Sequence, residues 1–412
     1  MNFTGLVKNP VLLALAACGV AAASGLAFLT HAPNRLVSGS AISLAQAVTA
    51  GDGLSTALAL AATLGSALPL VAGIFMRPRR VVHFWIAVAA AALLAALIGI
   101  AGGHAARLAF VAADSAGGES SGIARTSLGG AFWILAALTW LAAGDAIRRL
   151  GLTPGWRFAT NAVVIAPVLA LLATGALDWL SPLREYANRK DVFNAALLRH
   201  AQLVAASLAP ALAIGVPLGV AAVRNGKFIS AVRPALFATL NVIQTIPSIA
   251  LFGLLMAPLA LLAASTPALA RWGVQGIGMA PAVIALALYS LLPVVRGTAA
   301  GLTQVPRPIV DAAVGMGMSP RQVFWRVEVP LALPVLIAGL RVATVQAIGM
   351  AVVAALIGAG GFGAILFQGL LGGALDLALL GVVPVVAMAL LADALLQTLA
   401  MALAHGNADP VQ

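Results

Sequence analysis

The sequence predicts an all-α polytopic membrane protein with about ten transmembrane helices. Of its 412 residues, 62% are hydrophobic and 8% are charged, and the mean hydropathy is +1.05. These values lie far outside the range of water-soluble globular chains. Apolar runs of roughly 20 residues, the length that a helix needs to cross a hydrocarbon core, recur along the chain. The runs do not alternate apolar with polar residues, so they do not predict the strands of a membrane barrel.

Ten apolar runs mark the predicted spans. They cover residues 11–29, 54–76, 81–102, 127–147, 158–179, 201–222, 234–262, 279–295, 332–357 and 378–402. The first run contains Cys18, and "LAAC" resembles a lipoprotein cleavage box. Because apolar residues continue past the cysteine to Leu29, we expect an uncleaved first span.

The positions of lysine and arginine predict the orientation of the chain in the membrane. The formal net charge is +11, but basic residues come singly or in short clusters between apolar runs, which does not indicate a nucleic-acid partner. With the N-terminus inside, the inner connections hold fourteen Lys and Arg residues and the outer connections hold eight. The excess of basic residues on the inner side predicts that both termini are cytoplasmic.

The chain changes character at residues 181–200, "SPLREYANRKDVFNAALLRH", its most charged stretch of that length. The topology places this stretch outside, and we interpret it as an extracytoplasmic amphipathic connector. It separates an N-terminal membrane region, residues 1–180, with about five helices, from a second group of five spans in residues 201–405. No role for the N-terminal region follows from its sequence.

Several motifs that resemble enzyme signatures lack the required context. Residues 118–122, "GESSG", fit a nucleophile elbow, yet no strand and helix flank them. Residues 358–363, "GAGGFG", fit a dinucleotide-binding pattern but follow a predicted span, so we expect a tight turn or a re-entrant segment at the outer surface. The sequence has no P-loop and no histidine spacing typical of a metal site. We therefore predict neither an enzyme nor a bound cofactor or metal.

The longest predicted inner connection contains two short helices in residues 303–331. Ile309 to Met318 predict the first helix. Ser319 is placed as an N-cap with Pro320 at the first helical position and Gln322 completing a capping box, and Pro330 is expected to end the second helix. The pair carries five apolar side chains that need a surface to cover them: Val314, Met316, Met318, Phe324 and Trp325. That surface is either the protein's own inner face or a soluble partner.

These residues resemble the loop by which permease subunits of bacterial ABC importers bind their ATPase. The family pattern is E-A-A, three residues, G, nine residues, then I-x-L-P. The matching positions here are Asp311, Ala312, Ala313, Gly317, Val327, Val329 and Pro330. Aspartate replaces glutamate, and valine replaces isoleucine and leucine, so the spacing and the chemical character are kept. The segments 214–220, 241–255, 287–298 and 355–363 are similar to the branch that imports glycine betaine, choline and carnitine.

The resemblance covers about His200 to the end of the chain and implies a type I, MetI-like permease domain in residues 201–405. It implies a bacterial inner-membrane location and four kinds of partner: a separate ABC ATPase that uses ATP and Mg²⁺ and docks on residues 311–330, an extracytoplasmic solute-binding protein, a second permease subunit and the lipid bilayer. The alternatives are import of another small polar solute, such as methionine, and an ion-coupled secondary transporter. A non-transporting membrane assembly is a third class.

Two sets of polar residues fall inside predicted spans. Asn241, Gln244, Thr245 and Ser248 form one stripe if residues 234–262 are a single helix, and Tyr289 lies on a nearby span. The stripe either lines a translocation path or supplies hydrogen bonds between helices. Arg341 and Asp393 lie at equal depth, roughly 14–15 Å from the inner ends of their spans by helical rise. This equal depth predicts an intramembrane ion pair.

Overall fold

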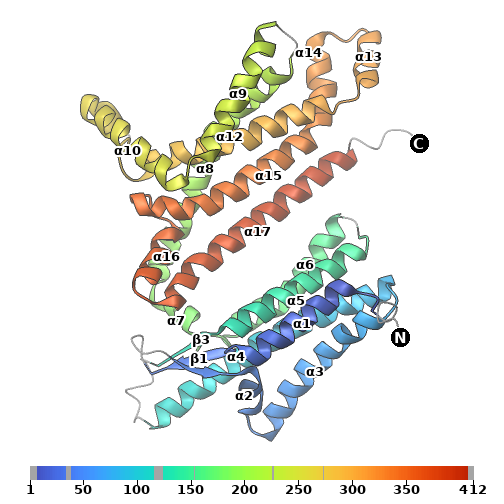
Figure 1. Ribbon diagram of the computed structural model, residues 1–412, viewed down its shortest axis with the longest axis vertical. Coiled ribbons are helices and arrows are strands. Elements are labelled where there is room, and N and C mark those ends of the chain that lie inside the picture. Colours follow the sequence, from blue (N-terminus) through green and yellow to red (C-terminus); the bar gives the residue numbers. More distant parts are fainter. Residues whose placement is uncertain are drawn as a thin grey trace. The chain divides into compact units, whose positions relative to one another are not determined.

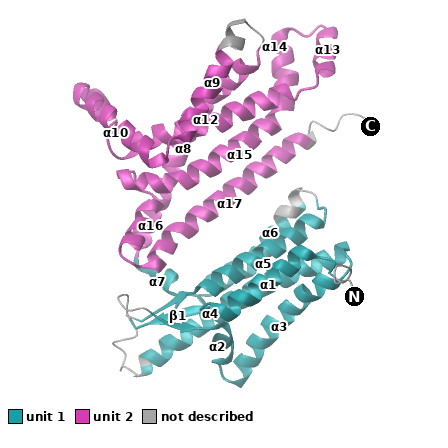
Figure 2. Ribbon diagram, viewed as in Figure 1, with its two compact units in different colours: residues 1–188 teal, residues 189–412 magenta. Residues whose placement is uncertain are grey.

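The computed structural model describes residues 7–33, 39–115, 124–152, 154–224, 227–271 and 273–406. The chain forms two compact units, residues 1–188 and 189–412 (Figure 2). The boundary falls inside the predicted connector 181–200, which is not one separate element. Residues 181–188 form a short helix of unit 1, and residues 190–200 are the first turns of a long helix of unit 2.

Unit 1 consists of helices and one small sheet (Figure 1). Its elements are α1 (Pro10–Gly25), β1 (Leu29–Ala32), β2 (Ser40–Ile42), α2 (Leu44–Thr49), α3 (Gly53–Phe75), α4 (Arg80–Ser115), β3 (Arg125–Leu128), α5 (Gly130–Arg149), α6 (Pro154–Ala173) and α7 (Ser181–Asn188). Helix α4 packs against α3, α5 and α6, and its buried alanines, such as Ala90 and Ala101, let these helices approach closely.

The antiparallel sheet, in the order β2-β1-β3, is a feature that the sequence did not predict. Each strand has only three or four residues, and β3 overlaps the start of the predicted span 127–147. Two contacts hold helix α7 against the region of β3. The Glu185 carboxylate, on a residue that is 3% exposed, lies 3.7 Å from the Arg125 guanidinium. The Arg184 side chain donates to the Ala124 carbonyl at 2.9 Å. The motif at 118–122 lies outside the described residues.

Unit 2 is helical throughout its described residues (Figure 1). Its elements are α8 (Lys190–Val223), α9 (Lys227–Thr245), α10 (Ser248–Ser265), α11 (Pro267–Arg271), α12 (Met279–Thr303), α13 (Arg307–Gly315), α14 (Pro320–Val323), the π-helical turn η2 (Phe324–Glu328), α15 (Val329–Val353), the 3-10 turn η3 (Ala354–Ile357), α16 (Phe362–Leu371) and α17 (Leu375–Gly406).

The predicted membrane fold is confirmed. Among the described residues, eight helical segments are long and apolar enough to cross a membrane, and two shorter apolar helices, Pro10–Gly25 and Ala159–Ala173, coincide with the predicted spans 11–29 and 158–179. One boundary prediction is wrong. The run 234–262 is not one span but two helices, α9 and α10, that meet at Ile246 and Pro247.

Helix α12 is the central element of unit 2, packed between α8 and α15. Small residues bring the helices together. A Cβ atom added at Gly297 would lie 2.8 Å from the Cα of Gly339 on α15, so the two backbones touch directly. Where α8 packs on α12, a Cβ added at Gly215 of α8 would lie 2.8 Å from the Val294 side chain. Glycine at these crossings gives the close van der Waals packing on which helix association in lipid depends.

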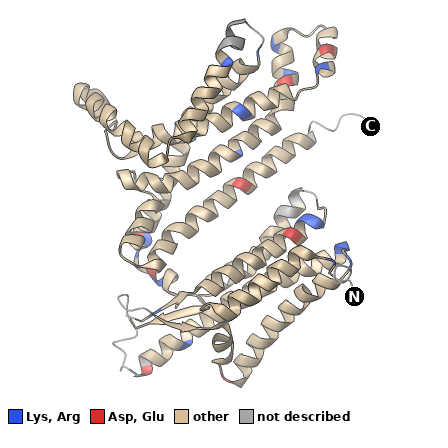
Figure 3. Cartoon of the chain, viewed as in Figure 1, with Lys and Arg blue, Asp and Glu red and all other residues tan. Residues whose placement is uncertain are grey.

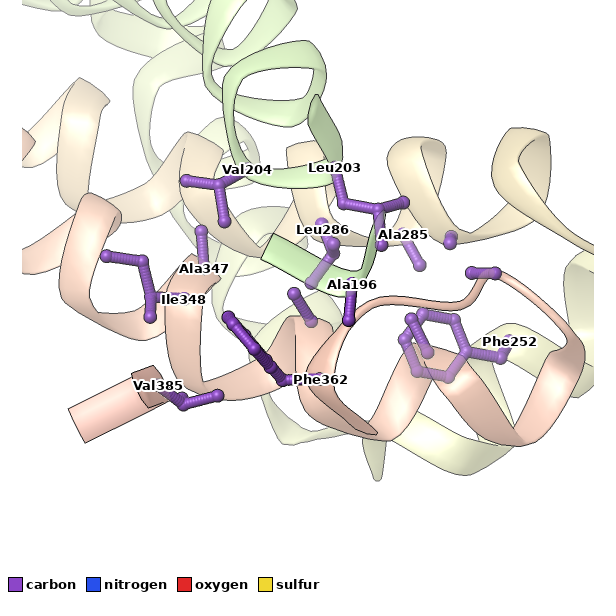
Figure 4. Packing of buried hydrophobic residues seen from close by; sticks show 14 of the residues in the cluster. Ala196, Leu203, Val204, Phe252, Ala285, Leu286, Ala347, Ile348, Phe362 and Val385 are labelled. Carbon is purple, nitrogen blue, oxygen red and sulfur yellow. The ribbon is translucent and has the colours of Figure 1, made fainter. Parts of the chain in front are cut away.

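The largest apolar core of unit 2 lies at the end of the helices where α16 packs (Figure 4). Leu203 of α8, Leu286 of α12 and Phe362 of α16 are fully buried there. The Phe362 ring packs against the Phe193 ring in a tilted arrangement, with a centroid distance of 5.2 Å, and its centroid lies 5.6 Å from that of the His200 ring. This core holds one end of unit 2 together, whereas α13 and α14 lie at the other end (Figure 1).

Candidate coupling loop and solute path

Helix α13 and the turn that follows it carry the first part of the predicted loop. Pro306 is the N-cap and Pro308 lies in the first turn, where a missing N–H costs nothing. Ala313 is buried, whereas Asp311 and Ala312 are exposed. The helix ends in a left-handed residue, Gly317, with φ of +83°. The Gly317 N–H donates to the Val314 carbonyl at 2.9 Å, and the Met318 N–H donates to the Ala313 carbonyl at 3.2 Å. The backbone conformation therefore requires glycine at this position.

The second helix begins as predicted but does not end as predicted. Ser319 is the N-cap, and its backbone N–H and side chain exchange hydrogen bonds with Gln322, which completes the capping box. Pro330 does not end this helix. In the wide π turn η2, the Val329 N–H donates to the Phe324 carbonyl, five residues back. This turn accommodates Pro330 near the start of α15, and the helical path continues from Pro320 to Ile357.

The loop presents apolar side chains that unit 2 does not cover. Met316 is 72% exposed, Trp325 is 60% exposed and Val314 is 56% exposed, whereas Met318 and Phe324 are half-buried. Charged residues surround them, as Figure 3 shows by the blue and red segments of α13 and α14. An exposed apolar group with a charged rim, on an element held in place by a capping box and a glycine turn, has the character of a docking surface.

The break at Ile246 and Pro247 changes the predicted polar stripe. Pro247 has no N–H to donate and adopts an extended backbone, with φ of −56° and ψ of 136°, so α9 ends at Thr245 and α10 begins at Ser248. Asn241, Gln244 and Thr245 therefore share one helix, but Ser248 begins the next. The four residues do not form the single helical stripe that the sequence predicted.

Helix α12 ties the break together with hydrogen bonds. The Gln244 side chain donates to the Tyr289 carbonyl at 2.6 Å, and the Tyr289 hydroxyl donates to the Ile246 carbonyl, which lies at the break between α9 and α10. Tyr289 is only 3% exposed, so it does not line an open path within this unit. One bond was missed by the sequence analysis: Arg296 donates to the Asn241 side chain at 2.7 Å, and both residues are exposed.

Two substitutions separate a path-lining role from a structural role for this region. Gln244→Leu removes a bond between helices, whereas Thr245→Val removes an exposed hydroxyl whose bond is to Val242 of its own helix. If the surface lines a path, Thr245→Val lowers solute uptake severalfold with normal assembly. We expect Gln244→Leu to lower the stability of the purified protein by about 1 kcal/mol. Uptake measured beside thermal unfolding distinguishes the two; unchanged uptake in Thr245→Val contradicts the lining role.

Arg341 and Asp393 lie in contact, as their equal depth predicted. The guanidinium makes a two-point salt bridge: Nε donates to one carboxylate oxygen and a terminal nitrogen donates to the other at 2.8 Å. The side chains are 37% and 32% exposed. The pair joins α15 to α17, which pack along each other. A two-point arginine–carboxylate pair fixes orientation as well as distance.

The glycine segment at 358–361 forms the predicted tight turn. Gly358, Gly360 and Gly361 all have φ between 77° and 82°. Helix α8 holds this turn from one side, because Arg199 Nε donates to the Ala359 carbonyl at 3.0 Å. The buried His200 ring lies at the same place, with its Nε2 3.1 Å from the Ile348 carbonyl. No pattern in the sequence pointed to a structural role for this histidine.

Comparison with known proteins gives matches for both units. Residues 211–405 match the family described as "binding-protein-dependent transport system inner membrane component". Residues 7–183 match the family described as "ABC transporter permease YehY, N-terminal domain". The two matched ranges fall on either side of the boundary between the compact units.

Two curated relatives and one solved structure illustrate the similarity. The osmoprotectant import permease protein OsmW of Salmonella typhimurium is 41% identical over 209 residues, which cover 50% of this chain and 88% of that protein. The glycine betaine/carnitine/choline transport system permease protein OpuCD of Bacillus subtilis is 37% identical over 193 residues, 46% of this chain and 75% of that protein. A chain of the inward-facing MetNI methionine ABC transporter aligns with a TM-score of 0.46 and 21% identity, over 52% of this chain and 98% of that chain.

Proposed function

Because the chain belongs to the binding-protein-dependent transport system inner membrane component family, the permeases of ABC importers, we propose that it moves a small osmoprotectant across the bacterial inner membrane with a separate ATPase docked on residues 311–330. The observation that carries the proposal is the loop. It has the family spacing, two well-defined turns and an exposed apolar surface at one end of unit 2. A docked ATPase would cover that surface.

The proposed mechanism is a two-state rearrangement. ATP binding closes a pair of ATPase subunits and draws their docked loops together, and hydrolysis releases them. The permease, paired with a second permease subunit, then alternates the side to which its central cavity opens. The loop transmits this movement because α14 leads through η2 directly into α15. In this arrangement the loop end of unit 2 and both chain termini are cytoplasmic.

The proposed solutes are glycine betaine, choline or carnitine, the compounds in the name of the Bacillus relative. Quaternary ammonium groups are commonly recognised by aromatic cages. In this chain the Tyr289 hydroxyl is bonded to the Ile246 carbonyl and the side chain is buried, so it supplies no cage wall. We therefore assign selectivity to a separate extracytoplasmic binding protein, which delivers the solute to the permease.

Ion-coupled secondary transport is less well supported. Such transporters use intramembrane carboxylates to bind the coupling ion. Asp393 is the carboxylate that the sequence placed clearly inside a span, and it is bound to Arg341. Import of a different small polar solute by the same machinery is the remaining alternative, and it differs only in the binding protein.

The test is isolation of the complex followed by reconstitution. Affinity purification of the full chain from its own membranes is expected to retain a P-loop ATPase, which mass spectrometry identifies. In proteoliposomes containing both proteins and the binding protein, we expect ATP-dependent uptake of labelled glycine betaine or choline, competed by the other compound. Uptake that persists without ATP and follows an ion gradient would favour the secondary transporter. ATP-dependent uptake of methionine, without uptake of glycine betaine or choline, would contradict the proposed solute but support the proposed ATP-driven import.

A further inference from the structure

A cavity of about 450 Å³ lies beside the coupling loop, within unit 2. Its walls come from the last turns of α8, the end of α12, the π turn η2 and the first turns of α15, and they include Pro217, Val220, Leu302, Trp325, Val329 and Leu336. The volume falls within the roughly 300–1,000 Å³ of pockets that hold small ligands. The cavity is therefore large enough for more than a few solvent molecules.

The cavity wall is apolar. Apart from Arg224, Thr298 and the indole N–H of Trp325, the lining side chains carry no polar group, and the Thr298 hydroxyl already donates to the Val294 carbonyl of its own helix at 2.9 Å. Water needs two to four polar partners to occupy a cavity stably. The lining side chains offer such partners at Arg224 and at the Trp325 indole, and the other walls are hydrocarbon, so the chemistry of the interior favours a hydrocarbon occupant.

One cation lies at this cavity. Arg224 follows α8, is exposed, and its guanidinium lies 5.2 Å from the centre of the Phe324 ring. Among the described residues it makes no salt bridge, and its contact with the π face of Phe324 leaves its edge N–H groups able to meet an anion. Arg321 and Arg326 lie on the adjoining α14 and η2 and are also exposed.

We propose that this cavity binds one acyl chain of an anionic phospholipid, with the lipid phosphate held by Arg224. The argument is charge complementarity: an apolar slot between helices, with a cation beside it at the end of the spans, matches a molecule that has a hydrocarbon tail and an anionic head. Such a lipid would contact α8, α12 and the coupling segment at once. Its assignment to the cytoplasmic leaflet rests on the proposed function, but the binding itself does not.

Native mass spectrometry of the purified full chain tests the proposal, with palmitoyl-oleoyl phosphatidylglycerol and the phosphatidylcholine of the same chains as probes. We expect each chain to retain one phosphatidylglycerol molecule and to prefer it over phosphatidylcholine. In Arg224→Gln this preference is expected to fall about fivefold, which is the effect of one cation near an anionic surface. Val220→Trp fills the cavity and is expected to lose the retained lipid. Ala221→Leu also narrows the cavity, and because Ala221 is exposed, the larger side chain is expected to be tolerated. This variant replaces Val220→Trp in the test if the tryptophan variant does not fold.

The matched control is Arg233→Gln. Arg233 is an exposed arginine on the neighbouring α9 that does not line the cavity, so its loss is expected to leave the lipid preference unchanged. Equal loss of preference in the two arginine variants, or full lipid retention in both filled variants, would overturn the proposal. None of these measurements requires transport. Failure of the lipid proposal can therefore be told apart from failure of the proposed function.

Discussion

Gly317→Val is expected to reduce ATP-driven uptake by at least about tenfold while membrane insertion stays normal. Gly317 has φ of +83°, a conformation that costs a residue with a side chain roughly 1–2 kcal/mol and a β-branched residue more. The space around it is open, since a Cβ there would meet nothing within 4 Å. Backbone strain, not a clash, would therefore alter the turn and misorient α13 relative to α14. Uptake in proteoliposomes and retention of the ATPase on the purified permease measure the effect.

The neighbouring glycine provides the control for this experiment. Gly315 is the last residue of α13, has no positive φ, and also has nothing within 4 Å of an added Cβ. Gly315→Ala is therefore expected to leave uptake and ATPase retention unchanged. If Gly317→Val transports as well as Gly315→Ala, the loop is not the element that couples the permease to its ATPase.

The second large effect is expected at the ion pair of α15 and α17. Arg341→Gln or Asp393→Asn leaves one charge in a membrane-spanning helix without its partner. Breaking a fully buried pair costs about 3–5 kcal/mol; with side chains 37% and 32% exposed, we expect roughly 2 kcal/mol after discounting for partial solvation. Thermal unfolding of the purified protein, beside the yield of inserted protein, measures the loss.

Two double variants test whether the pair itself is responsible. The double neutralisation Arg341→Gln with Asp393→Asn leaves no unpaired charge, so it is expected to be more stable than either single variant. The exchanged pair, Arg341→Asp with Asp393→Arg, should recover part of the lost stability. If losses simply add in both double variants, the residues act independently and the pair does not join the two helices.

Features that depend on local pattern or on counting along a helix could be predicted from the sequence. The spans follow from apolar length. The capping box follows from Ser319 with Gln322 three residues later, and Pro320 stands at the first helical position, so contacts within four residues decide it. Equal depth predicted that Arg341 and Asp393 meet, because two long helices through one bilayer bring residues of the same depth to the same level.

Features that depend on a partner far along the chain could not be predicted. A proline inside an apolar run can either kink a helix or break it. Here the helix breaks at Pro247, and the Tyr289 hydroxyl donates to the carbonyl of Ile246, 43 residues away in the chain. The Asn241 to Arg296 bond joins residues 55 apart. The π turn before Pro330 differs from an α-helical turn by a single extra residue in each hydrogen-bonded ring. Such a small change leaves no signal in the amino-acid composition of the segment. The strands of unit 1 are too short to show alternation.

The helical path from Pro320 to Ile357 has a mechanical consequence. It contains 38 residues, and its continuous α-helical part, α15, has 25 residues, which at the helical rise corresponds to roughly 38 Å. One end of the path is the capped turn at Ser319. The other end is the glycine turn, to which the Arg199 side chain donates a hydrogen bond. The π turn η2 and Pro334 lie along this path, and both are features at which helices bend. A reorientation of the loop is therefore expected to change the tilt of α15 at the π turn, and not to move all 38 residues as one rigid body.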